Sequence, residues 1–362
     1  MSSFYIYNPE KERIGILQNE TSVQWLENYQ SPGEVRIEAR ATQDNIELLI
    51  DGNRIYNTDS DSVAKICHID ITQTETEESI TARAVITSAL LDDRVVMATE
   101  AIKNIELSMY SIYEKNRRGL PLEAATPKGY QEHIDSEITW GSVLESETKI
   151  AEISGFGFKV TFNPETGIET FEVYKGTDRT DDTSDEYIGY FGTDTGNLQN
   201  VSVISGSTSY KNVAVVAGAG DGADRIVKIV SLGTVSGEKR KELYVDARDL
   251  QREYQEAIPT GEYDEEGNPR YRYETRQYGD EEYLSILESR GLEKLSECLK
   301  DFSITCDIVQ TNMYYGQDYF LGDRMPIKLP EYGIYTSARI SSVTMIYETE
   351  GNRIVATLDD FR

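Results

Sequence analysis

Short runs in which apolar and polar residues alternate dominate the first hundred residues of this chain. Val35, Ile37 and Ala39 alternate with charged neighbours, and this period of two is typical of a strand with one buried face. Turn signals such as Asp51-Gly52 separate the runs, so we predict many short strands arranged as a barrel or sandwich. The predicted strands of this part lie near 35–40, 46–50, 67–71 and 80–86.

The period changes in the middle of the chain and returns to two at its end. Ile102, Ile105, Met109 and Ile112 are three or four residues apart, which predicts a helix over about 98–115. The other predicted elements are a helix within 141–153, a hairpin over 156–175, strands near 198–204, 213–217 and 226–230, a projecting arm over 248–280 with its tip at 265–268, a helix over 280–300, and strands near 304–308, 340–347 and 354–358. The sequence therefore predicts an α+β fold that is mostly β.

The charge of the chain narrows the classes of partner. There are 64 acidic and 36 basic residues among 362, which gives a formal net charge of −28. Binding to nucleic-acid phosphates needs lysine and arginine to displace counterions, so this polyanion is not expected to bind DNA. The amino terminus has no basic segment followed by an apolar one, and no window approaches 18 apolar residues. We therefore expect neither a signal peptide nor a membrane anchor.

The three cysteines, Cys67, Cys298 and Cys306, form no CxxC motif and no cluster with histidine. We therefore expect neither a disulfide framework nor a zinc site, and predict buried free thiols in a protein made in a reducing cytoplasm. The acidic segment 178–186 could offer oxygens to Ca²⁺, but it lacks EF-hand spacing and a solvated loop is favoured. No metal and no cofactor is predicted.

A glycine-rich segment, Gly218-Ala219-Gly220-Asp221-Gly222-Ala223, follows the predicted strand 213–217 and approximates a dinucleotide-binding fingerprint. Such a site needs a helix after the glycines, whereas Ile226–Val230 is β-branched and predicts a strand. Asp221 would also place negative charge where a pyrophosphate binds. We therefore predict a turn between two strands.

The sequence predicts no catalytic cluster. Carboxylate pairs of the kind used by glycosidases arise by chance among 64 acidic residues. His68 follows Cys67 in a predicted strand, where alternation separates their side chains, and His133 accompanies no nucleophile motif. The 24 tyrosines instead cluster within 254–278 and 314–319, and tyrosine is enriched at protein interfaces. These patterns favour protein–protein contact over enzymatic chemistry.

Two segments each contain an Asp-Arg pair: Phe171-Glu172-Val173-Tyr174-Lys175-Gly176-Thr177-Asp178-Arg179-Thr180 and Gly220-Asp221-Gly222-Ala223-Asp224-Arg225. Both resemble the tail-hub proteins of long-tailed bacteriophages, including the amino-terminal hub part of prophage tail endopeptidase-type proteins. Weaker similarity lies at 31–35, 90–95 and 243–249. The resemblance implies a structural protein of the virion tail, with no catalytic residues, that closes the distal end of the tail tube.

The resemblance also implies a homotrimer with two β-barrel domains of the tube type in each subunit. Three copies would form a six-fold-like ring that docks on a hexameric tail tube and presents three-fold symmetry to the tip. The first barrel would comprise 1–98, the second 197–239 with 301–362, and a mixed α/β lobe 99–196 with 240–300. The implied partners are the tail-tube or distal tail protein, the tape-measure protein and tip or receptor-binding proteins, with DNA passing through unbound.

In this reading Asp178, Arg179, Asp224, Arg225 and Tyr210 are subunit-interface or structural residues. Three copies would carry a formal charge of −84, and acidic residues within about 8 Å of the channel would repel passing DNA. Many related proteins continue into a further domain, so cell-wall cleavage or receptor binding is expected on another chain. Two alternatives stay open: a peptidoglycan- or glycan-cleaving tail lysin that uses paired carboxylates, and a carbohydrate-binding tail module that uses the tyrosines.

Overall fold

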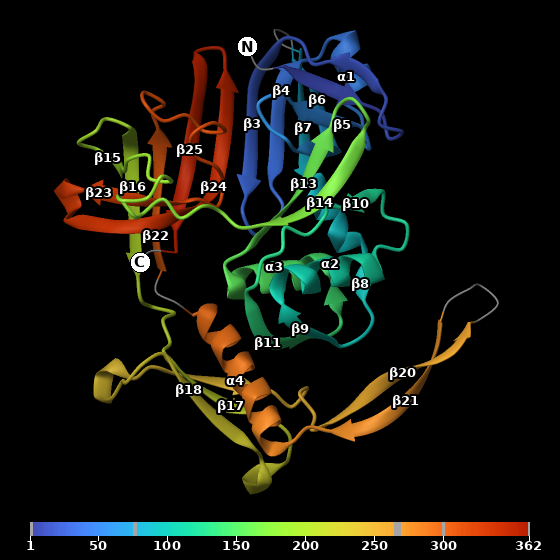
Figure 1. Cartoon of the computed structure of the whole chain (residues 1–362). Helices are drawn as coiled ribbons and strands as arrows, with labels where there is room; N and C mark the ends of the chain where they lie inside the picture. Colours follow the sequence, from blue (N-terminus) through green and yellow to red (C-terminus); the bar gives the residue numbers. More distant parts are fainter. Residues whose placement is uncertain (1–2, 75–77, 264–268, 299–300, 361–362) are drawn as a thin grey trace.

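The computed structural model describes residues 3–74, 78–263, 269–298 and 301–360, and the chain is mostly β, as the sequence predicts (Figure 1). Strands from both ends of the chain, blue and red in Figure 1, lie in one large sheet. Two smaller lobes, formed by the middle of the chain, contain the longer helices. None of the helices in the described ranges is long and apolar enough to cross a membrane.

The large sheet has the strand order β16-β22-β25-β24-β3-β4-β7-β6-β5-β1-β2, with β23 also paired to β24 and β15 to β23. Its amino-terminal strands are β1 (Phe4–Tyr7), β2 (Arg13–Ile16), β3 (Glu20–Asn28), β4 (Glu34–Arg40), β5 (Arg54–Asn57), β6 (Val63–Gln73) and β7 (Glu78–Ile86). Its later strands are β15 (Phe191–Gly192), β16 (Leu198–Gly206), β22 (Asp301–Ile308), β23 (Arg324–Leu329), β24 (Ile334–Glu348) and β25 (Gly351–Asp359). The described strands follow an open path in which no barrel closes, so the two barrels stay a prediction.

The long strand β24 joins the two ends of the chain. It pairs antiparallel with β25 on one side and with β3 on the other, where Val343 lies opposite Glu27. Buried side chains from both ends of the chain pack into one hydrophobic cluster, which includes Trp25, Ile37 and Ile340. The first and last strands therefore share a single core.

The predicted strand at 46–50 is wrong, because this segment contains helix α1 (Gln43–Leu48). The Thr42 hydroxyl accepts a hydrogen bond from the backbone N–H of Asn45 and so caps the helix. The buried Asn45 side chain donates to the carbonyl of Gln18 over 2.7 Å. An alternation of three apolar residues is too short to outweigh these local hydrogen bonds. The neighbouring predictions are confirmed as β4, β6 and β7.

The cysteine prediction is wrong for Cys67, whose side chain is exposed. A register shift in β6 between Ile66 and His68 takes Cys67 out of the inward-facing set of the strand. Cys306 is buried, as predicted, and Cys298 is half-buried. All three are free thiols.

A second lobe packs two helices against the β13–β14 hairpin around its own hydrophobic cluster. Helix α3 begins with a capping box between Ser142 and Glu145 and ends at Gly155, whose φ of 73° suits glycine. The lobe contains η1 (Thr87–Asp93), β8 (Val95–Val96), β9 (Glu100–Asn104), α2 (Ile105–Asn116), β10 (Leu122–Ala124), β11 (His133–Ile138), β12 (Gly141–Ser142), α3 (Val143–Ser154), β13 (Gly157–Asn163) and β14 (Ile168–Tyr174). The predictions of a helix within 141–153 and a hairpin over 156–175 are confirmed.

Helix α2 begins seven residues later than the predicted start at 98, because β9 precedes it. Ile102, which was expected on the helix face, lies in β9 opposite Ser136 of β11. The Asn104 side chain then accepts a hydrogen bond from the backbone N–H of Leu107, which fixes the start of the helix.

The third lobe is a three-stranded sheet of order β18-β17-β19 with helix α4 on one face. Its elements are β17 (Val213–Ala217), η2 (Gly222–Asp224), β18 (Val227–Ser231), η3 (Gly237–Lys239), β19 (Glu242–Asp246) and α4 (Asp280–Ser296). The predicted arm is a hairpin of β20 (Glu253–Tyr263) and β21 (Pro269–Gln277) that projects away from the rest of the chain (Figure 1). Its predicted tip at 265–268 lies outside the described residues.

Candidate functional site

The first Asp-Arg pair, Asp178-Arg179, connects the loop after β14 to strand β23. Arg179 is almost fully buried, and its Nε donates to a carboxylate oxygen of Asp323 over 2.8 Å. The other Asp323 oxygen accepts from the backbone N–H of Thr177 over 2.8 Å, and the backbones of residues 177–179 and Arg324 exchange two further hydrogen bonds. Asp178 is engaged locally, because it accepts from the hydroxyl and the backbone N–H of Thr180.

Two glycines allow this loop and strand to come together. A Cβ on Gly176 would lie 1.9 Å from the carbonyl oxygen of Gly322, and one on Gly322 would lie 2.2 Å from the ring of Tyr29. Tyr29 is buried below them, and its hydroxyl donates to the Gly155 carbonyl and accepts from the Gly176 N–H. A larger residue at Gly176 would push the two backbones apart, and one at Gly322 would displace the buried ring of Tyr29.

Sequence reasoning missed the acidic and basic partners of this contact. Arg324 donates to the backbone and the carboxylate of Asp360, and Arg339 donates to the Gly322 carbonyl over 2.8 Å. The missed residues Asp323 and Arg324 are themselves an Asp-Arg pair that follows a glycine. That repetition of the motif is the signal that could have found them.

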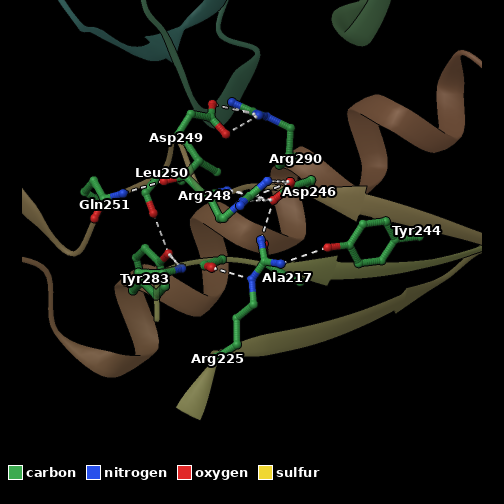
Figure 2. A network of polar contacts seen from close by, with 12 residues as sticks. Ala217, Arg225, Tyr244, Asp246, Arg248, Asp249, Leu250, Gln251, Tyr283 and Arg290 are labelled. Atoms are coloured by element: carbon green, nitrogen blue, oxygen red, sulfur yellow. Dashed lines mark hydrogen bonds and ion pairs between the residues drawn. The ribbon is translucent and has the colours of Figure 1, made fainter. Parts of the chain in front are cut away.

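The second Asp-Arg pair stabilises the glycine-rich turn of the third lobe (Figure 2). The guanidinium of Arg225 donates to the carbonyls of Gly218 and Ala217, to the hydroxyl of Tyr244, and to the carboxylate of Asp246. One side chain therefore bridges the turn and the parallel strands β17 and β19.

Asp246 lies between two arginines in this network (Figure 2). Hydrogen bonds from Arg248 and then from Arg225 lower its pKa to about 2. Beside it, the Tyr283 hydroxyl of α4 donates to the Leu250 carbonyl and accepts from the backbone N–H of Ala219. The turn is thus held from the sheet and from the helix, by polar contacts that need no ligand.

The remaining candidate residues lie at the surface of the same region. Asp224 is exposed in η2, and its backbone N–H donates to the Asp221 carbonyl. Tyr210 is half-buried in the loop between β16 and β17, beside a depression lined by Ser207, Asn212 and Lys241. The structure brings Asp224 and Arg225 into one turn, and it places Asp178 and Arg179 in a different contact near the large sheet.

The glycine-rich segment has the structure predicted from the sequence. It forms a turn with the short helix η2 and leads into strand β18, and no helix of the dinucleotide-binding kind follows it. Among the described residues there is no group of three or more His, Cys, Asp or Glu side chains placed to hold a metal ion.

A cavity of about 480 Å³ lies where the end of β3, the β5–β6 loop, the β13–β14 hairpin and the 315–323 loop meet. Glu27 lies in its wall, and one carboxylate oxygen accepts from Trp25 Nε1 at 3.0 Å and from the hydroxyls of Ser60 at 2.5 Å and Ser62 at 2.7 Å. The other oxygen accepts a longer bond of 3.4 Å from the Tyr315 hydroxyl. Sequence periodicity did not indicate this cavity, because its walls come from parts of the chain that are far apart in the sequence.

A second carboxylate of the cavity is paired with a lysine. Lys159 of β13 lies 2.5 Å from Asp61, and its ammonium is 5.4 Å from the centre of the Tyr174 ring. Although burial opposes it, the charges of Asp61, Glu172 and Glu27 raise the pKa of Lys159, so the lysine is a cation at neutral pH. The cavity therefore combines fixed carboxylates with aromatic walls.

Comparison with known proteins identifies relatives along the whole chain. The model of the family described as Siphovirus ReqiPepy6 Gp37-like protein matches residues 3–358. A search of curated proteins finds no match.

Solved structures with the same fold are prophage and bacterial tail proteins. The 43 kDa tail protein of prophage MuSo2 from Shewanella oneidensis is 11% identical, with 99% of this chain and 98% of that chain covered and a TM-score of 0.59. A tail protein from Neisseria meningitidis MC58 is 10% identical, with coverages of 99% and 97% and a TM-score of 0.56. Prophage tail protein gp18 from Listeria monocytogenes EGD-e is 13% identical, with coverages of 98% and 94% and a TM-score of 0.51. At these identities the likeness establishes a shared fold.

Proposed function

Because the chain belongs to the siphovirus ReqiPepy6 Gp37-like family, we propose that it is a structural hub protein that closes the distal end of the phage tail tube. The observation that carries this proposal is the end-to-end match of its fold to prophage tail proteins. Family and fold confirm the predicted resemblance to siphophage tail proteins, and they agree with the predicted location in the virion tail.

In this proposal three copies form a ring in which each subunit supplies two wall segments. The amino-terminal and carboxy-terminal strand groups of the large sheet would take the places of the two tube-type barrels. Their direct pairing through β3 and β24 supports this, because it sets the two groups side by side at a fixed angle. Six such groups would face the tail tube, while the ring presents three-fold symmetry to the tip.

The proposed partners are the tail-tube or distal tail protein, the tape-measure protein and tip or receptor-binding proteins. The proposed units are 1–98, 99–196 with 240–300, and 197–239 with 301–362. We propose one change to them, since β17 pairs with β19 and packs against α4: residues 213–296 then form a single lobe.

The charge of the chain supports a passive role toward DNA. Three copies would carry −84 formal charges, and acidic residues near the channel would repel the phosphates of passing DNA. Screening limits this repulsion to about 8 Å at physiological salt, so residues at the channel wall decide it. A neutral or basic wall in an image of the assembled tail would contradict this part of the proposal.

We propose that the chain has no enzymatic activity. A glycosidase needs one carboxylic acid and one carboxylate on either side of a substrate. In the cavity, Asp61 is paired with Lys159, and three donors hold Oε1 of Glu27, so the two carboxylates do not offer a matched acid and base. Incubation with purified cell walls tests this reading, and release of muropeptides or reducing ends would favour the lysin alternative.

Light scattering coupled to size exclusion tests the hub. Three copies of the 40.9 kDa chain would weigh about 123 kDa, and we expect this species either alone or on mixing with the tail-tube protein. A matched control is the same measurement with the tube protein alone. A chain that stays monomeric in both conditions, and is absent from the tip of imaged tails, would overturn the proposal.

A further inference from the structure

We propose that the cavity beside Glu27 binds an arginine side chain of a partner polypeptide. The cavity has a volume of about 480 Å³ and opens between the large sheet and the second lobe. Its walls combine one preorganised carboxylate with aromatic rings, which is the chemistry that recognises a planar organic cation. The proposal goes beyond the proposed hub function. Only the expectation that the ligand is a polypeptide rests on that function.

The two oxygens of Glu27 are used unequally within the chain. Trp25, Ser60 and Ser62 all donate to Oε1, whereas Oε2 has one long contact of 3.4 Å with the Tyr315 hydroxyl. The 3.4 Å contact is long for a hydrogen bond between two oxygens, so Oε2 can exchange it for a shorter bond from a ligand. The three donors on Oε1 hold the carboxylate in place without a cost of ordering when a ligand arrives.

The ion pairs of the cavity also favour a cationic ligand. Asp61 is neutralised by Lys159, and Asp323 is neutralised by Arg179. Within the described part of the chain, no Lys, Arg or His lies within ion-pair distance of Glu27. Glu27 acts on Lys159 only at longer range, so a cation from outside would be its first direct ion-pair partner among the described residues.

The cavity also has an aromatic lining. Tyr174, Tyr315, Phe158 and Phe320 line the cavity, and Phe320 is 47% exposed. Burial, reinforced by the charge of Glu27, raises the pKa values of the Tyr174 and Tyr315 hydroxyls, so both rings are neutral at physiological pH. The ammonium of Lys159, which lies 5.4 Å from the Tyr174 ring centre, shows that this lining accommodates a cation.

These features favour arginine over other ligands. A guanidinium can lie flat on an aromatic ring and still donate sideways to Glu27, whereas an ammonium cannot stack. The net charge of −28 also favours a basic partner. Carbohydrate is the alternative ligand, because sugars also bind to aromatic rings and carboxylates. NMR with both kinds of probe distinguishes arginine from carbohydrate.

Saturation-transfer NMR with small probes tests the proposal on the full chain. The probes are N-acetyl-arginine amide, its neutral analogue N-acetyl-citrulline amide, and N-acetylglucosamine. We expect saturation of the arginine probe alone, with affinity about tenfold weaker in Glu27→Gln and also weaker in 1 M NaCl. The exposed Glu350→Gln variant is the matched control and should bind as the wild type does.

A second variant, Phe320→Ala, tests arginine binding even if Glu27→Gln fails to fold. Phe320→Ala removes an exposed aromatic wall and should also weaken arginine binding severalfold while the thermal unfolding temperature stays unchanged. Equal saturation by citrulline, saturation by N-acetylglucosamine in place of arginine, or arginine binding that neither variant weakens would overturn the proposal. Binding of the probe to a chain that never trimerises would refute the hub and leave the arginine site standing.

Discussion

Glu147 in helix α3 is a carboxyl group buried in the second lobe with no solvent exposure. Neither of its oxygens has a hydrogen-bond partner among the described residues. Its neighbour Ile150 belongs to the apolar cluster of the lobe. Burial alone raises the pKa of Glu147 well above its usual value, because the charged form loses its hydration and gains no partner.

This raised pKa makes the stability of the lobe depend on pH. The folded chain holds the proton of Glu147 more tightly than the unfolded chain does. The contribution of Glu147 to the free energy of unfolding is therefore most favourable below the pKa of the unfolded chain, which is about 4.5. As the pH rises from that value toward the folded-state pKa, the lobe loses about 1.4 kcal/mol per pH unit, and above the folded-state pKa the loss is constant. Glu147→Gln has no such titration, so its stability relative to the wild type should rise with pH.

Hydrogen–deuterium exchange of peptides that cover α3 measures the lobe itself. Wild type and variant are compared at the same pH, so that other titrating groups and the intrinsic exchange rate cancel. The ratio of protection, variant over wild type, should grow about tenfold per pH unit above pH 5 until the folded-state pKa is reached. Glu147→Leu, which also removes the unpaired polar atoms, should protect α3 further, by about 1–3 kcal/mol.

The control is Glu123→Gln, which changes an exposed carboxylate of the same lobe and should leave protection within about 0.5 kcal/mol at every pH. A protection ratio for Glu147→Gln that stays constant between pH 5 and 8 would mean that Glu147 keeps its ordinary pKa. The reasoning from burial would then be refuted.

Three further predictions concern the polar contacts and the thiols. Arg179→Ala leaves a buried carboxylate unpaired and should destabilise the chain by about 3–5 kcal/mol in denaturant unfolding, and a loss below 1 kcal/mol would contradict the assigned burial. Arg248→Ala removes the hydrogen bonds that lower the Asp246 pKa most and should raise that pKa from about 2 toward 3.8 in an NMR titration, whereas no change would contradict the contact. The exposed Cys67 should react rapidly with a thiol reagent at pH 8, whereas Cys306 should not react until the chain unfolds, because burial raises its pKa to about 12.

Strands with one face in solvent could be predicted from the sequence. In β4 and β7 apolar residues alternate with charged ones because the sheet has a core side and a water side, and the pattern records that difference. The β13–β14 hairpin was equally clear, since Asn163 to Gly167 supplies turn chemistry between two alternating runs.

Element boundaries set by side-chain caps were harder to predict. Ile102 fits the helical spacing of α2, yet β9 pairs with β11 and Asn104 caps the helix beyond it. Thr42 caps α1 in the same way, in a segment whose apolar spacing resembles a strand. In both cases one hydrogen bond accepted by a polar side chain from a backbone N–H decides the boundary, and the periodicity of apolar residues does not report it.

Contacts between distant segments could not be predicted from local patterns. Arg179 and Asp323 are 144 positions apart, and the walls of the Glu27 cavity come from several separate parts of the chain. The Asp-Arg motifs identified Arg179 and Arg225 as notable residues without indicating what they contact. Their partners follow from the pairing of β23 and β24 and of β17 and β19, which is a property of the folded chain.

The buried ion pairs lie where the second lobe joins the large sheet, and this position bears on the proposed function. Arg54 of β5 reaches the fully buried Glu169 of β14 over 2.5 Å, and Arg179 after β14 reaches Asp323. Apolar residues at such sites would stabilise a protein as well or better, whereas one wrong partner is costly. Buried ion pairs of this kind therefore determine the relative orientation of the second lobe and the large sheet more than they add to the free energy of unfolding. The two buried ion pairs link both ends of β14 to the large sheet. A hinge motion between the second lobe and the large sheet would therefore have to break one of these pairs. A rigid subunit of this kind suits the wall of a ring better than an enzyme that must open and close around a substrate.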